Sequence, residues 1–210
     1  MMTFYDCSTA PSPRRARILL AEKGVEHETI QVDLRNGEQL SEACRRINPL
    51  CTVPALRTEN GLILTDNAAI TAFLEARYPE PALLGVTPEE KAEIASWNWR
   101  IEFEGLLAIA EAMRNSSPAL QQRALPGPVN YPQIPELAAR GLARVQQFFI
   151  TLNAHLAERN FIAAGRYSIA DITAVVAVDF ARVVKIKPDE QYPHLQRWRA
   201  AMAERPAMAL

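Results

Sequence analysis

The dipeptide Val53-Pro54 is the part of this sequence that most strongly suggests a binding site. Proline lacks a backbone N–H, so it fits poorly inside a β-strand unless the strand lies at an edge or the site is special. A cis bond before Pro54 would turn the backbone outward and leave the amide and carbonyl of Val53 free for a ligand. The alternative is a trans proline in an edge strand, because only about 5–6% of X-Pro bonds are cis.

The cysteines and histidines do not suggest a metal or redox centre. Cys7, Cys44 and Cys51 form no Cys-x-x-Cys pair, and the histidines are dispersed without nearby cysteine or acidic ligands. We therefore expect no metal site. An odd number of cysteines without a secretion signal favours reduced thiols in a cytoplasmic protein.

Helix-start and turn signals divide the first 80 residues into short elements. Ser12-Pro13 is typical of a helix start, because serine can cap and proline suits the first turn. Asp66 or Asn67 can cap a helix that runs to about Arg77, and Asn60-Gly61 predicts a hairpin with a type I′ turn. Strand-like segments occur at residues 3–5, 29–34, 52–56 and 62–64, and a weaker helix at 38–46. The order β-α-β-α-β-β-α predicts a small sheet flanked by helices.

The sequence after Tyr78-Pro79-Glu80-Pro81 has almost no strand signal. Apolar stripes at helical spacing predict helices over 88–114, around 142–156, over 168–184 and over 193–204. Ser168-Ile169-Ala170-Asp171 is a Ser-x-x-Asp variant of the capping box. Five prolines between 118 and 135 exclude regular helix there. We predict a first domain at 1–80, a linker at 81–87 and an all-helical domain at 88–210.

Composition excludes several functional classes. The 210 residues carry a net charge of −1, which disfavours general nucleic-acid binding. The most apolar stretch, residues 169–184, is interrupted by Asp171, Asp179 and Arg182, so no transmembrane helix is expected. We expect a globular protein without nucleic-acid or membrane partners.

Four segments in register resemble the cytosolic glutathione transferases. In the first half these are residues 8–15, 21–24, 48–56 and 64–70, which read STAPSPRR, AEKG, NPLCTVPAL and LTDNAAI. In the second half, residues 168–171 resemble the helix-capping motif of the family and residues 193–198 its closing segment. The loop at 8–15 is most similar to a bacterial and fungal subgroup that lacks the usual catalytic Tyr, Ser or Cys.

The resemblance implies a thioredoxin-like α/β domain with a cis Pro54, followed by a helical domain. It implies that the Val53 backbone pairs with the cysteinyl part of glutathione. Asp66 would face the γ-glutamyl ammonium, Asn67 would donate to the γ-glutamyl carboxylate, and Gln39 would bond the glycyl end. From the residues alone, Asp66-Asn67 can also be a plain helix cap, and Gln39 a solvated helix residue.

The resemblance also implies that the usual activating hydroxyl or thiol would stand at Ala10, whose side chain cannot hydrogen-bond a thiolate. Ser12 and then Thr9 are the catalytic candidates. The alternatives are that Ser12 only caps the helix and that the Thr9 hydroxyl is solvated. Arg14 and Arg15 would add positive potential, whereas Arg17 is expected to be a solvated surface charge. Met113 and Ser116 would line the electrophile pocket, unless they only end the long helix.

The expected activity is conjugation of the glutathione thiolate to an electrophilic small molecule by a cytoplasmic homodimer, with glutathione as co-substrate. Two alternatives remain open. A noncatalytic binding or regulatory protein of the same fold is favoured by Ala10. A glutathione-dependent thiol-disulfide oxidoreductase would need a cysteine there, and Ala10 argues against it.

Overall fold

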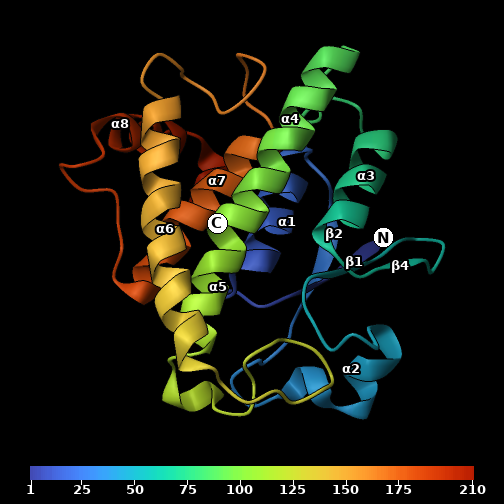
Figure 1. Cartoon of the computed structure of the whole chain (residues 1–210). Helices are drawn as coiled ribbons and strands as arrows, with labels where there is room; N and C mark the ends of the chain where they lie inside the picture. The colour runs from blue at the N-terminus through green and yellow to red at the C-terminus, as the bar shows by residue number, and fades with distance from the viewer. The chain divides into compact units, whose positions relative to one another are not determined.

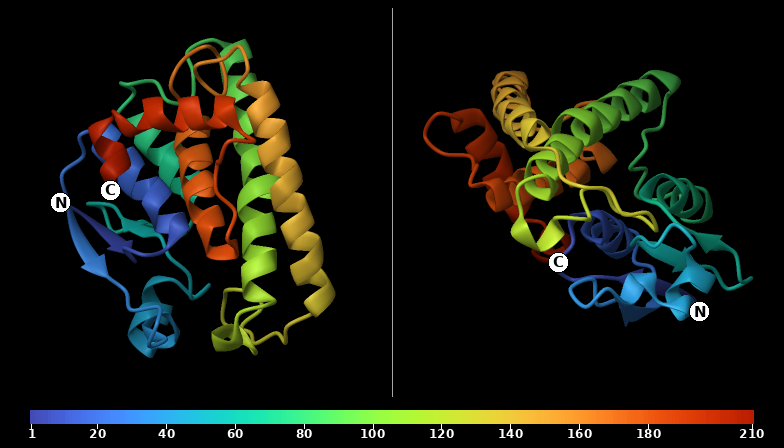
Figure 2. Two further views of the ribbon diagram at one scale, coloured as in Figure 1. Left: turned by 90° about the vertical axis from the view of Figure 1, so that its left-hand side faces the viewer. Right: turned by 60° about the horizontal axis from the view of Figure 1, so that its bottom comes forward.

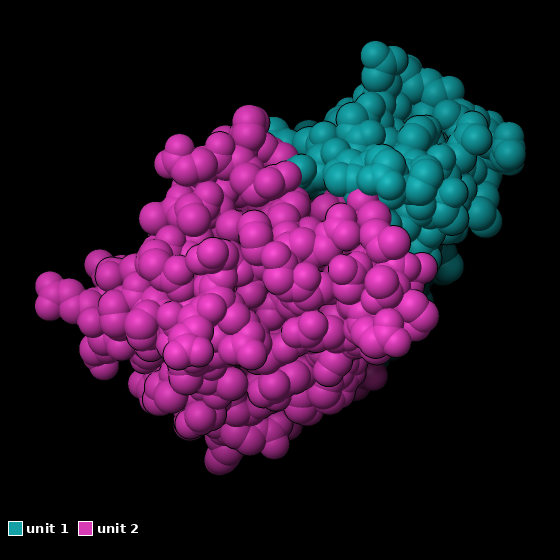
Figure 3. Space-filling model, turned by 90° about the horizontal axis from the view of Figure 1, so that it is seen from above, with its two compact units in different colours: residues 1–81, 125–130, 210 teal, residues 82–124, 131–209 magenta.

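The structure is a computed structural model that describes residues 1–210. The chain forms two compact units, coloured separately in Figure 3. The first contains residues 1–81, 125–130 and 210, and the second contains residues 82–124 and 131–209.

The first unit is built on a four-stranded sheet of order β2-β1-β3-β4 (Figure 1). Its strands are β1 (Met2–Asp6), β2 (His27–Gln31), β3 (Ala55–Arg57) and β4 (Ile63–Leu64). Strands β1 and β2 are parallel, whereas β3 is antiparallel to both β1 and β4. The helices are α1 (Pro11–Glu22), α2 (Glu42–Ile47) and α3 (Asn67–Arg77). The predicted small sheet flanked by helices is confirmed.

The two faces of this sheet carry different helices. Helices α1 and α3 pack side by side, as Figure 2 also shows. Tyr5 and Ala55 form a buried cluster against which Cys44 and Ile47 of α2 pack. Because successive strand residues point to opposite faces, the fully buried Phe4 and Leu56 face away from α2.

Several predicted boundaries in this unit were wrong. Strand β2 begins at His27 and ends at Gln31, and β3 begins only after Pro54. The helix predicted over 38–46 is a 3₁₀ turn (Glu38–Leu40) followed by α2, because Ser41 is extended and caps α2 through the Cys44 amide at 3.2 Å.

The hairpin between β3 and β4 exists, but its type I′ turn was wrong. That turn needs positive φ at both central residues, and here Gly61 alone has it, at 83°. The Gly61 amide donates to the Thr58 carbonyl at 3.0 Å, and the Thr58 amide donates to Leu62 at 2.9 Å. This is the longer hairpin loop, in which glycine takes the left-handed position at the end of the turn.

The second unit is helical and contributes no strand to the sheet. Helix α4 (Pro88–Arg100) continues through a π-helical segment (Ile101–Leu106) into α5 (Leu107–Arg114), as the helix predicted over 88–114 requires. The others are α6 (Pro135–His155), α7 (Ile169–Phe180) and α8 (Pro193–Ala203). Helices α5 and α6 approach so closely that a Cβ at Gly141 would lie 2.6 Å from the Ala112 nitrogen. No helix has the length and apolar character needed to cross a bilayer.

Helix α7 is the centre of the second unit, since every residue from Ile169 to Val178 is buried. Its start carries the predicted capping box between Ser168 and Asp171. Asp171 accepts from the Ser168 amide at 3.0 Å, the Ile162 amide at 2.9 Å and the Trp198 Nε1 at 3.1 Å. Burial raises the pKa of Asp171 to about 6, because the loss of water outweighs the lowering effect of these hydrogen bonds.

Candidate functional site

The candidate site lies at one end of the sheet of the first unit. Tyr5 pairs with Ala55, and Leu56 pairs with Leu64, both in antiparallel register. Continuing these registers brings Cys7 level with Val53, and Val53 level with Asn67. The loop after β1, the segment before β3 and the start of α3 therefore meet at the same edge.

Val53 presents its backbone at this edge. The Val53-Pro54 bond is cis, as expected, and Val53 precedes the first residue of β3. Neither its amide nor its carbonyl has a hydrogen-bond partner in the protein. The Val53 side chain packs against Tyr5 and Ala55 on the same face of the sheet as α2. It therefore anchors a peptide whose amide and carbonyl are available to a ligand.

The start of α3 supplies donors and a carboxylate. Asp66 is the N-cap, and its Oδ1 accepts from the Ala69 amide at 2.8 Å. The other carboxylate oxygen has no partner, and Asp66 is exposed. The amides of Asn67 and Ala68 also lack acceptors, as is usual in a first helical turn. Capping therefore leaves Asp66 with charge to offer a ligand cation, beside amides that suit an anion.

The Asn67 side chain binds Ser12. Its Nδ2 donates to the Ser12 Oγ at 3.0 Å and to the Ser12 carbonyl at 3.1 Å. The side-chain amide is therefore already engaged within the protein, which differs from the free donor expected at Asn67. A serine hydroxyl has one proton and two acceptor sites, so accepting from Asn67 leaves the Ser12 proton free to donate elsewhere.

The expectation that Ser12 caps α1 was wrong. Helix α1 begins at Pro11, its N-cap is Ala10, and no side chain caps it. Pro11 and Pro13 have no N–H, so Ser12 supplies the one amide of the first three helical positions. That amide has no acceptor in the protein. The start of α1 thus presents both the Ser12 amide and the Ser12 hydroxyl.

The loop between β1 and α1 is a tight turn. The Ala10 amide donates to the Cys7 carbonyl at 3.0 Å, which leaves Ser8 and Thr9 at the tip. The Thr9 hydroxyl lies 3.6 Å from the Cys7 sulfur, so it is not simply solvated. Cys7 itself is buried directly after the strand, as expected of a strand-end residue.

Gln39 lies beside Val53 rather than in solvent. The two residues line a cavity of about 20 Å³ together with Cys44 and Cys51, which is room for about one water. The Gln39 Oε1 is buried and has no hydrogen-bond partner. Cys51 is a buried thiol, as expected, and its backbone is left-handed with φ 55°.

Met113 and Ser116 belong to the second unit, at the end of α5. The Ser116 hydroxyl donates back to the Ala112 carbonyl at 2.8 Å, and the Asn115 amide nitrogen Nδ2 donates to Glu111 at 2.9 Å. Both polar side chains thus satisfy carbonyls that the helix end leaves open. Met113 is half-buried.

Comparison with known proteins covers both units. Residues 9–77 match the family described as glutathione S-transferase, N-terminal domain, and residues 117–206 match its C-terminal domain. Glutathione S-transferase 2 of Saccharomyces cerevisiae is 31% identical over 210 residues, covering 99% of this chain and 88% of the relative. The chain belongs to the glutathione S-transferase family.

Solved structures of glutathione S-transferase proteins share the fold. Gtt2 from Saccharomyces cerevisiae has a TM-score of 0.89 and 30% identity, covering 99% of this chain and 98% of its own. A glutathione S-transferase domain-containing protein from Marinobacter aquaeolei has a TM-score of 0.88 and 33% identity, covering 98% and 99%. The thioredoxin-like first domain followed by a helical domain is the fold of this transferase family.

Sequence reasoning missed one group of polar side chains near the candidate site. Arg17 is not a solvated charge: it forms an ion pair at 2.6 Å with Asp6, whose side chain is 2% exposed. Gln31 donates to the same carboxylate at 2.9 Å. No sequence signal pointed to this group, because the pairing of Asp6 with Gln31 depends on the parallel register of β1 and β2, which only the folded chain shows.

Proposed function

We propose that this protein conjugates the thiolate of glutathione to electrophilic small molecules, with glutathione bound by the domain at 1–80 and the electrophile by the helical domain at 88–210. Family membership supports the reaction class. The observation that carries the proposal is the edge where the free Val53 peptide meets Asp66 and the unpaired amides of α3. These groups complement a ligand that has a peptide, an ammonium and a carboxylate.

In this proposal the Val53 amide and carbonyl pair with the cysteinyl residue of glutathione. The free Asp66 oxygen receives the γ-glutamyl ammonium, and the amides of Asn67 and Ala68 receive the γ-glutamyl carboxylate. Gln39, whose side-chain NH2 group can donate to a carboxylate, is assigned to the glycyl end. Pro54 follows Val53 and has no backbone N–H, so it offers no donor that would compete with the Val53 amide for the ligand.

Asp66 gives the sharpest binding test. Asp66→Ser keeps an N-cap but removes the charge, so the fold should persist while glutathione affinity falls about 10- to 150-fold, as for a lost charged hydrogen bond. Glu59→Ala, which removes an exposed carboxylate from the β3–β4 hairpin, is the control. Calorimetry that gives the wild-type dissociation constant for Asp66→Ser would refute this assignment.

Thiol ionisation requires a substitute for the residue missing at Ala10. A free cysteine thiol has a pKa of about 8.5, so raising the thiolate to most of the population at pH 7 needs about 2.7 kcal/mol. One hydroxyl bond to the charged sulfur contributes about 1.5–3 kcal/mol. We assign it to Ser12, whose proton is free and whose oxygen is held by Asn67. We propose on this basis that the protein belongs to the subgroup without a catalytic Tyr, Ser or Cys at the usual position.

Ser12→Ala should raise the pH midpoint of kcat/KM for chlorodinitrobenzene by about one unit, with glutathione affinity nearly unchanged. Thr9→Val should shift the midpoint less, because the Thr9 hydroxyl contacts Cys7. Wild-type pH profiles in both folded variants would exclude both hydroxyls.

The noncatalytic alternative is favoured by Ala10. It predicts that the protein binds glutathione but turns over no electrophile, so the wild-type measurement with chlorodinitrobenzene and a panel of other electrophiles distinguishes the two functions.

We also propose that the protein is a homodimer. Trp99, Phe103 and Leu107 are exposed at successive helical turns of α4–α5, and the first two rings stack with centroids 5.1 Å apart. Such a stripe on a helix face is typical of a protein interface. Phe103→Glu should convert the dimer to a monomer in light scattering, whereas Val86→Glu, at another exposed apolar residue, should not.

A further inference from the structure

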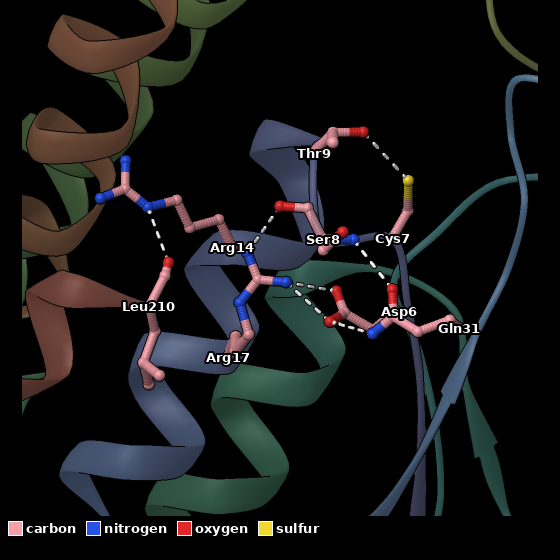
Figure 4. A network of polar contacts seen from close by, with 8 residues as sticks. All are labelled: Asp6, Cys7, Ser8, Thr9, Arg14, Arg17, Gln31 and Leu210. Carbon is pink, nitrogen blue, oxygen red and sulfur yellow. Dashed lines mark hydrogen bonds and ion pairs between the residues drawn. The ribbon is translucent and has the colours of Figure 1, made fainter.

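The carboxylate of Asp6, at the end of β1, holds two side chains from other elements (Figure 4). Arg17 of α1 donates through NH1 to both carboxylate oxygens, at 2.8 and 2.6 Å. Gln31, at the end of β2, donates through Nε2 to Oδ2 at 2.9 Å. The parallel pairing of Asp6 with Gln31 and the position of Arg17 on α1 converge on one buried group.

The same two side chains grip the backbone of Ser8. The Ser8 amide donates to Gln31 Oε1 at 3.0 Å, and the Ser8 carbonyl accepts from Arg17 NH2 at 3.3 Å. Both peptide groups that flank Ser8 are therefore held by residues that Asp6 orients. We call Asp6, Arg17 and Gln31 the Ser8 clamp.

The clamp determines where the next amide points. The Ser8–Thr9 peptide is trans, and in a trans peptide the C=O and N–H point in opposite directions. Holding the Ser8 carbonyl toward Arg17 therefore turns the Thr9 N–H to the other side of the loop. This amide has no acceptor in the protein. It lies one residue before Ala10, where the usual activating side chain is missing.

We propose that the Ser8 clamp is a set of positioning residues for thiol activation, which fixes the turn so that the Thr9 amide donates to the glutathione sulfur. The inference rests on the proposed function. An ion pair that only joined β1 to α1 would need Asp6 and Arg17 alone. Gln31 is exposed, yet its amide bonds the carboxylate with one end and the Ser8 peptide with the other.

Two variants loosen the clamp without removing the buried carboxylate. Gln31→Met keeps the side-chain length and removes both hydrogen bonds. Arg17→Lys keeps a positive charge for Asp6. It removes the second guanidinium nitrogen, which donates to the Ser8 carbonyl. Thr29→Val on the same strand, and Arg182→Lys in the second unit, are the matched controls. Neither control side chain has a hydrogen bond in the structure.

The measurement is the pKa of the bound glutathione thiol, from the ultraviolet absorbance of the thiolate. We expect Gln31→Met and Arg17→Lys to raise it by about one unit, or about tenfold less thiolate below the pKa, with the controls unchanged. Affinity for S-methylglutathione, which cannot ionise, should stay within about twofold. The kcat/KM for chlorodinitrobenzene should fall at low pH and recover at high pH.

The outcomes separate this inference from the proposed function. If the wild-type protein binds no glutathione, both fall. If it binds glutathione and both folded variants keep the wild-type thiol pKa, only the positioning role is overturned. If S-methylglutathione affinity falls as much as the thiolate fraction, the clamp is merely structural, and the inference is again overturned.

Discussion

Helices α1 and α7 begin in opposite ways. At α7 the Ser168 hydroxyl accepts from the Ala170 amide, and the Asp171 carboxylate turns back to the Ser168 amide, all of it buried. At α1 the N-cap is Ala10, no side chain accepts a helical amide, and the Ser12 amide is left without an acceptor. The start of α7 therefore has no free amide to offer a ligand, whereas the start of α1 does.

The aspartates beside these two starts differ in the same sense. Asp6 faces a guanidinium, and its partners hold a loop at the candidate site. Asp171 faces only uncharged donors, and it ties α7 to Ile162 and Trp198. One carboxylate organises a surface loop, and the other fastens a core helix. The cap of α7 therefore serves stability, whereas the missing cap of α1 leaves an amide that our proposal assigns to ligand binding.

The largest expected change in the free energy of unfolding comes from the capped start of α7. Asp171→Ala leaves the buried N–H groups of Ser168, Ile162 and Trp198 without an acceptor, so the free energy of unfolding should fall by about 3–5 kcal/mol. Urea denaturation measures this change. Asp179→Ala, which removes a more exposed carboxylate farther along α7, should cost much less; equal losses would mean that the capping box is not special.

The clamp carboxylate should matter less for stability. Asp6→Ala leaves Arg17 without its partner, but the Arg17 side chain is 16% exposed and can turn to solvent. We expect a loss of about 2–3 kcal/mol, below that of a fully buried pair. In a double-mutant cycle, adding Arg17→Ala should cost little more. Fully additive losses would show that the two side chains do not act together.

The pH dependence should expose Asp171. Because its folded pKa is raised to about 6, the folded protein binds a proton there that the unfolded chain does not. This contribution is complete below pH about 4 and is lost as pH rises through about 6. Between pH 5 and pH 8 the stability advantage of wild type over Asp171→Asn should shrink by about 1–1.5 kcal/mol. An advantage that grows with pH would contradict the assignment.

The smallest expected change in the free energy of unfolding comes from adding a side-chain cap to the start of α1. Ala10 has the extended backbone of an N-cap, with φ −93° and ψ 138°. Ala10→Ser should therefore stabilise the protein by about 0.5–1 kcal/mol. Ser12→Ala, at a residue that does not cap, should change the free energy of unfolding by less than Ala10→Ser does. A larger change for Ser12→Ala than for Ala10→Ser would indicate that Ser12 is the cap.

Local patterns were readable from the sequence. The capping box is four consecutive residues, and the apolar stripe over 88–114 repeats at helical spacing. Pro79 and Pro81 mark the point after which strand signals almost disappear. The start of α1 was misplaced because Pro11 suits a first helical position as well as Pro13 does. The hairpin was found, but its type depends on loop length, which Asn60-Gly61 does not reveal.

The contacts between distant segments were not readable. The Ser12–Asn67 bond joins residues 55 positions apart. The clamp requires the register of β1 with β2 and an arginine that reaches across from α1. Composition marks Arg17 as charged, and only the folded chain shows that Asp6 is beside it. Side-chain chemistry can be listed from a sequence, but its pairing is a tertiary property.

The make-up of the first unit bears on how this protein can be recombined. Residues 125–130, encoded far downstream of the sheet, belong to the same compact unit as residues 1–81. A chimaera that takes only residues 1–81 from one parent protein would combine the sheet of that parent with residues 125–130 of the other parent. Gene shuffling at the proline-rich junction near residue 81 therefore breaks a unit that looks whole in the sequence, and a successful exchange has to carry residues 125–130 with it.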